Sequence, residues 1–252
     1  MLPLSDPDIR RQSTPVVTWT IIAACSAVFL YQLTLGQLDQ IAFSFQFGFI
    51  PAELLTGDEF TVLDLGRRTI DVTSPIPTWA TAFSAMFLHG GFLHILGNML
   101  FLWVFGDNIE DRMGHVKYLV FYLLCGIAAM AAQMAINPAS EIPNIGASGA
   151  IAGVLGAYLV LFPHSRINTL VFIVFLMSVV RIPAFFLLGF WFVMQFFSGV
   201  GSINPAVDQG GVAYWAHVGG FVAGLAIAAL FRPLLVRRRR VRDTWAPPGW
   251  NS

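Results

Sequence analysis

Long apolar runs recur along this chain, and shorter segments that carry most of the charge separate them. A helix that crosses the hydrocarbon core of a bilayer takes about 20 apolar residues, within a range of about 17 to 25. Runs of this length predict membrane-crossing helices, because a helix in lipid satisfies its own backbone hydrogen bonds. We predict six spans, at residues 16–35, 92–109, 116–136, 147–163, 183–199 and 213–231.

The connection between the first two spans, residues 36–91, is long. It contains an apolar patch at 41–55 (IAFSFQFGFIPAELL), but Pro51 lies within that patch and Pro75 and Pro77 follow it. Proline breaks a helix interior, because it lacks a backbone N–H and its ring clashes with the preceding turn. We therefore predict a long first loop with amphipathic pieces at the membrane interface, and no crossing helix.

The stretch INTLVFIVFLMSVV, residues 167–180, is apolar but ambiguous. As a helix its 14 residues would reach about 21 Å, which is too short to cross a core of about 30 Å comfortably. Arg166 precedes it, and Arg181 and Pro183 follow it. We interpret it as an interfacial or re-entrant piece that leads into the fifth span. Its Val, Ile and Phe content leaves open a buried short strand.

The composition agrees with a membrane protein. Hydrophobic residues make up 56% of the chain and charged residues 11%, whereas a soluble domain carries about 25% charged residues. We expect an all-α polytopic membrane protein with a six-transmembrane-helix bundle at 16–232. A short N-terminal segment at 1–15 and a basic tail at 233–252 flank it. The net charge is zero, so nothing in the balance indicates a nucleic-acid partner.

The positions of Lys and Arg predict the orientation. Only Arg67 and Arg68 fall on one side of a six-span topology, and all other Lys and Arg residues fall on the opposite side. The cytoplasmic side of a membrane protein is the side rich in Lys and Arg. We therefore expect a multi-pass protein of the plasma (inner) membrane with both termini cytoplasmic. The run RRRRVR at 237–242 is typical of topology and lipid-headgroup contacts.

Four polar side chains lie near the starts of even-numbered spans, which begin at the outer face. His94 and Asn98 belong to the second span, Ser148 to the fourth and His217 to the sixth. His94 and Asn98 are four residues apart and share a helix face. Polar groups at this depth in a membrane are costly, and by default they indicate function.

Ser148 and His217 can meet only if the fourth and sixth spans run parallel, which requires that 167–180 does not cross the membrane. A serine becomes a nucleophile when a base takes its proton, and a histidine suits that role. The N–H of Ser148 and the side chains of Asn98 and His94 are available donors for a developing oxyanion. No carboxylate lies near these positions, so we expect a dyad.

Small residues surround both groups. Gly149 and Gly153 form one G-x-x-x-G pair, and Gly220 and Gly224 form another. Such pairs let helix backbones approach closely, and Gly146 leaves room above the serine. Taken alone, each pair is usually a packing feature, and a serine beside it usually makes a helix–helix hydrogen bond. The joint pattern on one side of the membrane is harder to assign to packing.

The strings HGGFLHILGNMLFLWVFG, GASGAIAGVLGAY and AHVGGFVAG carry a resemblance. Over about residues 78 to 232 the chain resembles the rhomboid intramembrane serine proteases. The resemblance implies a six-helix protease with a water-filled cavity open to the outer face, and no cofactor. It implies Ser148 as nucleophile and His217 as general base. His94, Asn98 and the Ser148 amide would form the oxyanion hole. Single-span membrane proteins would be the substrates.

The sequence departs from the family pattern at Ala152. Family members often carry a tyrosine there, stacked on the catalytic histidine, so the resemblance leaves open whether another aromatic residue orients His217. Trp191 we assign to packing or lipid contact. Gln195 either lines the site or makes a helix–helix hydrogen bond. His89 we expect to be solvated in its loop.

Other functions remain as alternatives. A rhomboid-like scaffold would bind transmembrane clients without cutting them, but it would need neither Ser148 nor His217. A transporter would place charged residues at mid-membrane, and the span centres carry no Asp or Glu. The histidines lack the H-E-x-x-H spacing of a zinc protease, so we expect no metal.

We expect 198–211 to act as a mobile cap and the fifth span as a gate. The oligomeric state stays open.

Overall fold

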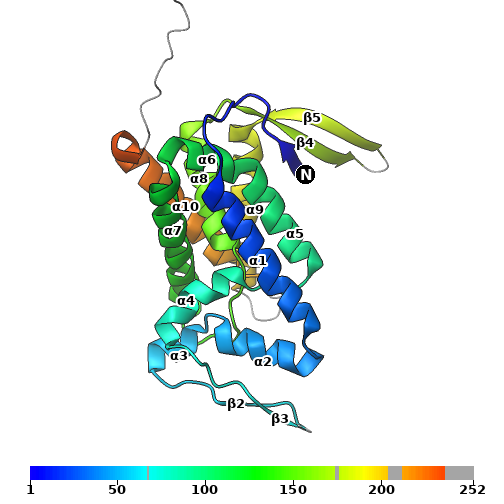
Figure 1. The fold of residues 1–252 in the computed structure, drawn as a ribbon, viewed down its shortest axis with the longest axis vertical. Coiled ribbons are helices and arrows are strands. Elements are labelled where there is room, and N and C mark those ends of the chain that lie inside the picture. Colours follow the sequence, from blue (N-terminus) through cyan, green and yellow to red (C-terminus); the bar gives the residue numbers. More distant parts are fainter. Residues whose placement is uncertain (67, 174–175, 204–211, 236–252) are drawn as a thin grey trace, which may run out of the picture.

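The long apolar runs form helices that stand side by side in a bundle (Figure 1). The structure is a computed structural model that describes residues 1–66, 68–173, 176–203 and 212–235. Five of the described helices are long and apolar enough to cross a membrane. They are α1 (Val16–Thr34), a continuous helix from Phe92 to Met113, α7 (His115–Ile136), α9 (Ala184–Ser202) and α10 (Tyr214–Leu235). The prediction of a helical, polytopic membrane protein is confirmed.

The continuous helix consists of three parts. It begins as α5 (Phe92–Phe101), passes through a π-helical stretch, η3 (Leu102–Gly106), and ends as α6 (Asp107–Met113). A Cβ at Gly106 would lie 2.8 Å from the Tyr118 hydroxyl and 3.2 Å from Thr18. The absence of a side chain there lets α1, η3 and α7 pack tightly.

The helix of the predicted fourth span, α8 (Ser148–Leu161), is short. Its 14 residues span about 21 Å, less than the hydrocarbon core. Every residue from Gly149 to Tyr158 is buried, because α7 and α10 pack closely against α8. The helix therefore lies inside protein and does not need to match the thickness of the lipid.

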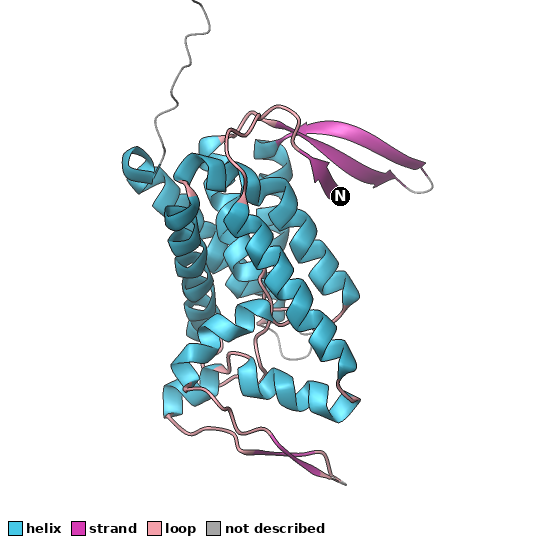
Figure 2. Ribbon diagram, in the orientation of Figure 1, coloured by secondary structure: helices cyan, strands magenta, loops and turns pink. Residues whose placement is uncertain are grey.

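The connection from α8 to α9 is a β-hairpin, made of β4 (Arg166–Ile173) and β5 (Leu176–Pro183) (Figure 2). The N-terminal strand β1 (Leu2–Ser5) pairs antiparallel with β4, so the sheet order is β1-β4-β5. Of the two interpretations of 167–180, the re-entrant piece is wrong, because the hairpin projects away from the bundle (Figure 1), and the interfacial piece stays a prediction. The alternative of a buried short strand is right about the strand. It is wrong about the burial, because side chains such as Met177 are exposed.

The long first loop forms a layer at the opposite end of the bundle from this hairpin (Figure 1). None of its described residues between 36 and 91 belongs to a helix long enough to cross a membrane. The layer contains α2 (Gln37–Phe47), α3 (Pro51–Thr56), β2 (Val62–Asp64), β3 (Thr69–Asp71), η1 (Thr78–Ala80), α4 (Thr81–Ser84) and η2 (Ala85–Phe87). The prediction that this connection contains no crossing helix is confirmed for its described residues.

The N-terminal segment is packed against the bundle. The Asp6 carboxylate accepts hydrogen bonds from the hydroxyls of Tyr158 and Ser165, and the Asp8 carboxylate accepts one from the Arg166 N–H. Burial is the largest influence on Asp6, and it raises the pKa of that carboxyl. The basic run at 237–242 lies outside the described residues, as does the 204–211 part of the proposed cap. Residues 198–202 belong to α9.

Candidate functional site

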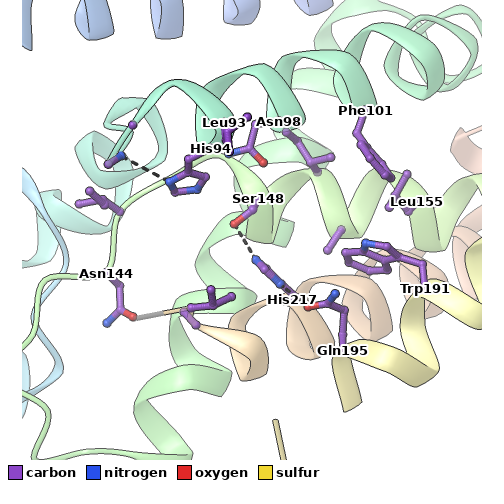
Figure 3. A pocket seen from close by; sticks show the side chains of 18 of the residues that line it. Leu93, His94, Asn98, Phe101, Asn144, Ser148, Leu155, Trp191, Gln195 and His217 are labelled. Atoms are coloured by element: carbon purple, nitrogen blue, oxygen red, sulfur yellow. Dashed lines mark hydrogen bonds between the residues drawn. The ribbon is translucent and has the colours of Figure 1, made fainter. Parts of the chain in front are cut away.

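A cavity of about 890 Å³ lies among α5, α8, α9 and α10. Ser148 and His217 line it, together with His94 and Asn98 from α5 (Figure 3). The structure thus brings together the four polar residues that the sequence placed at one depth. A fifth polar group, the Gln195 side chain, comes from α9.

The position of Ser148 is fixed by the loop that precedes it. The Gly146 N–H donates to the Ala85 carbonyl at 2.8 Å, and Phe49 and Asn144 exchange two backbone hydrogen bonds. Gly146 has φ +121°, where side chains are rarely tolerated, and a Cβ there would lie 2.7 Å from His94 Nε2. Only glycine fits at this position, two residues before the start of α8.

The Ser148 hydroxyl and His217 are in direct contact. His217 Nε2 lies 2.8 Å from Ser148 Oγ, which is hydrogen-bond distance between a nucleophile and a base. The serine is the first residue of α8 and the histidine is in the first turn of α10. The pair is therefore formed by two neighbouring helix starts.

Glycines make this contact possible. A Cβ at Gly220 would lie 2.0 Å from the Gly149 carbonyl oxygen, and a Cβ at Gly224 would lie 2.0 Å from that of Gly153. The contacts advance in the same direction along both helices, so α8 and α10 run parallel. The backbones of α8 and α10 touch here, which keeps Ser148 level with His217.

The second ring nitrogen of His217 also has a partner. His217 Nδ1 lies 2.7 Å from Gln195 Oε1. The Trp191 ring lies 6.0 Å from the imidazole, centroid to centroid, at an interplanar angle of 36°. The assignment of Trp191 to packing or lipid contact is therefore incomplete, because Trp191 lines the cavity. A signal existed: Trp191 and Gln195 are four residues apart on one helix face.

Three N–H donors surround the space above Ser148. Asn98 Nδ2 is buried and has no hydrogen-bond partner within the described part of the chain. His94 Nδ1 accepts a hydrogen bond from the Gly90 N–H at 3.4 Å, so His94 Nε2 carries the proton of the neutral ring. The Ser148 N–H belongs to the first turn of α8, where N–H groups have no acceptor within the helix.

His89 is not solvated as we expected. It is 2% exposed, and its ring lies edge-on to His94 at 5.1 Å between centroids. The backbone N–H of His89 donates to Gln32 Oε1 at 3.2 Å, and its ring Nδ1 lies 3.2 Å from the Phe87 carbonyl oxygen. Burial is the main cause that lowers the pKa of His89 to about 4. His89 is therefore a neutral support behind His94.

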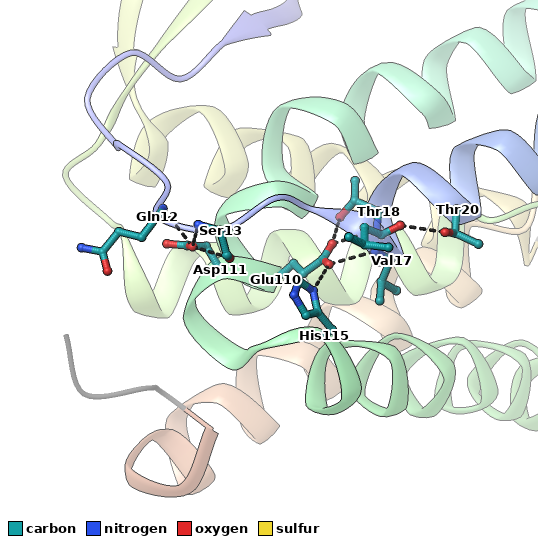
Figure 4. Close-up of polar contacts among 9 residues, drawn as sticks. Gln12, Ser13, Val17, Thr18, Thr20, Glu110, Asp111 and His115 are labelled. Carbon is teal, nitrogen blue, oxygen red and sulfur yellow. Dashed lines mark hydrogen bonds and ion pairs between the residues drawn. The ribbon is translucent and has the colours of Figure 1, made fainter. Parts of the chain in front are cut away.

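A second polar cluster lies at the other end of the bundle, around Glu110 (Figure 4). The buried Glu110 carboxylate accepts hydrogen bonds from the backbone N–H groups of Val17 and Thr18, both at 2.8 Å, and from the Thr18 hydroxyl. His115 Nδ1 lies 2.6 Å from the same carboxylate. The cluster ties the first turn of α1 to α6 and to the start of α7. Within the described ranges, no three His, Cys, Asp or Glu side chains are grouped to hold a metal ion.

Fold and site together define a polytopic helical membrane protein with a polar site enclosed by its helices. A model of the rhomboid domain matches residues 77–234. Over 71% of this chain and 48% of the relative, identity to Rhomboid protein 1, mitochondrial, of Saccharomyces cerevisiae is 30%. Identity to the Rhomboid protease GluP of Bacillus subtilis is also 30%, over 60% of this chain and 26% of that protein.

This chain belongs to the rhomboid family, because the domain model covers more than half of it. It spans about half the length of the yeast relative and about a quarter of the length of GluP. Residues 77–234, which the rhomboid domain model matches, contain the site residues described above, from His89 to Gly224.

Proposed function

We propose that the chain is an intramembrane serine endopeptidase that hydrolyses peptide bonds in or near transmembrane segments of membrane proteins. One observation carries the proposal: the 2.8 Å contact between Ser148 Oγ and His217 Nε2 beside Asn98 Nδ2, which has no hydrogen-bond partner among the described residues. A packing serine would need neither a base nor a free donor facing the same cavity.

The proposed reaction begins when Ser148 Oγ attacks the substrate carbonyl carbon and His217 Nε2 takes the hydroxyl proton. The carbonyl oxygen becomes an oxyanion, and Asn98, His94 and the Ser148 N–H donate to it. His217 then returns the proton to the leaving amine, which leaves an acyl-serine. Water hydrolyses this ester in the same way, with His217 again as base.

The proposed substrates are single-span membrane proteins that enter the cavity sideways. A helical substrate hides its carbonyl carbons behind intrahelical hydrogen bonds, so Ser148 can attack only where the helix unwinds. Glycine and proline lower helix stability by about 1 and 3 kcal/mol per residue relative to alanine. We therefore expect cleavage near such residues.

The proposed placement follows the basic residues. Arg10, Arg11, Arg112 and Lys117 lie in segments at the hairpin end of the bundle, and the first loop lies at the other end (Figure 1). The positive-inside rule then puts both termini in the cytoplasm and the site toward the outer face of the plasma (inner) membrane. The exposed apolar side chains of β5 would contact the lipid interface on the cytoplasmic side.

The function is tested with purified protein in lipid vesicles and a single-span reporter that has Gly and Pro in its span. We expect two fragments, and no cutting of a matched reporter with an all-leucine span. We also expect a fluorophosphonate, which modifies activated serines, to label Ser148. Binding of the reporter without cleavage and without labelling would contradict the proposal and favour a scaffold.

Replacing Asn98 with alanine is expected to lower kcat by about 100- to 1000-fold, with little change in KM, because an oxyanion donor acts mainly in the transition state. Asn98→Leu keeps the approximate size and has no donor, so its kcat should fall as far. Initial rates on the Gly/Pro reporter measure both constants. Asn168→Ala, in β4 and outside the lining of the cavity, is the control. Wild-type rates in Asn98→Leu would refute a donor role.

A further inference from the structure

We propose that Gln195 is a positioning residue that selects the tautomer of His217, which would make the site a Ser–His–Gln triad. This inference rests on the proposed protease function. A neutral imidazole carries a single proton, on either Nδ1 or Nε2. Only the tautomer with the proton on Nδ1 leaves Nε2 free to take the proton of Ser148.

The geometry selects that tautomer. Gln195 Oε1 lies 2.7 Å from His217 Nδ1, and Ser148 Oγ lies 2.8 Å from Nε2. An amide oxygen accepts hydrogen bonds but cannot donate them, so the proton of the ring has to sit on Nδ1. In Figure 3, Gln195 and Ser148 approach the imidazole from opposite sides. The two contacts therefore fix the ring at both nitrogens.

A neutral partner suits this location. An aspartate or glutamate in this role would place a charge inside the membrane-spanning bundle, where ionised groups are costly. Gln195 supplies the acceptor oxygen without a charge. The difference matters during the reaction, because a carboxylate would stabilise the protonated imidazole more strongly than an amide does. An amide orients His217 but leaves it a weaker base.

Trp191 complements this contact from the same face of α9. Its ring is tilted by 36° against the imidazole, and it also lies 6.1 Å from the Phe221 ring. Ala152 lines the cavity but has no ring to offer. α9 thus supplies two of the groups that orient His217: an acceptor at the ring edge and an aromatic surface beside it.

The test compares Gln195→Leu, Gln195→Glu and wild type on the Gly/Pro reporter across pH. Removal of the acceptor in Gln195→Leu is expected to lower kcat by about 10- to 1000-fold, below the roughly 10,000-fold loss seen when a triad histidine is forced into the wrong tautomer. Gln195→Glu keeps the acceptor, so activity should return to within about tenfold of wild type. On acidification, Gln195→Glu should lose activity at a pH about one unit or more above that at which wild type loses it. The reason is that a nearby negative charge favours the protonated, inactive imidazole.

Met194→Leu is the matched control, because Met194 is the neighbouring residue of α9 and half exposed. Its rates and pH profile should equal those of wild type. Nitrogen NMR of ¹⁵N-histidine protein gives a readout independent of turnover. We expect a protonated Nδ1 for His217 in wild type and a mixture of tautomers in Gln195→Leu.

Equal losses in Gln195→Leu and Gln195→Glu with an unchanged pH profile would overturn the inference and leave Gln195 as a packing residue. Wild-type activity in Gln195→Leu would overturn it as well. Both results keep the proposed function intact, because they require a wild-type protein that cuts. Failure of wild type to cut or to react with the fluorophosphonate would instead reject the function itself.

Discussion

Replacing Ser148 with alanine is expected to lower cleavage of the Gly/Pro reporter by at least about 10,000-fold, which is below detection in most assays. Loss of the nucleophile in a serine protease costs about a millionfold in kcat, because no acyl intermediate can form. His217 and the oxyanion donors remain but have no nucleophile to assist. Product formation over time, measured with wild type and variant in the same vesicles, checks this expectation.

The Ser148→Ala variant should otherwise resemble wild type. One hydrogen bond contributes about 1 kcal/mol to stability, so its melting temperature should change little. The variant should still co-purify with the reporter, because the cavity is unchanged. Ser178→Ala, at an exposed position of β5, is the control and should cut normally. Undiminished cutting by Ser148→Ala would show that this serine is not the nucleophile.

Replacing Gly224 with alanine is expected to reduce activity by about 100-fold or more and to lower the melting temperature. The added Cβ would lie 2.0 Å from the Gly153 carbonyl oxygen and 2.5 Å from its Cα, so α8 and α10 must move apart by more than 1 Å. A misplacement of about 1 Å can cost about 100-fold in rate. Overpacking costs about 1–3 kcal/mol of stability.

Gly189→Ala in α9 is the matched control for this substitution. A Cβ at Gly189 would meet nothing within 4 Å, and alanine is the better helix former by about 1 kcal/mol. We expect its melting temperature and activity to be unchanged or slightly higher. Thermal unfolding in detergent and reporter cleavage measure both variants. If Gly224→Ala matched Gly189→Ala in both, close contact between α8 and α10 would not be needed for the site.

The sequence alone located the helices because the apolar runs end where charge, proline or glycine begins. It also placed Ser148 level with His217, since both are near the start of an even-numbered span. The hairpin at 166–183 was harder to predict. A short apolar run has no decisive periodicity, and the partner of β4 is β1, which lies more than 160 residues earlier in the chain.

The surroundings of His217 were only partly predictable, for a different reason. Trp191 and Gln195 were visible as neighbours on one helix face, but α9 is apolar around most of its circumference. Its sequence pattern therefore does not say which face turns toward α10. The burial of His89 depends on Gln32 in α1 and on the loop layer, which no local pattern shows.

The pairing of β1 with β4 has a consequence for the order of events during synthesis. Leu2 pairs with Leu170, so β1 cannot join its sheet until β4, more than 160 residues later in the chain, has also been synthesised. Until then the N-terminus has no sheet to join, even though α1, α5 and α7 are already complete.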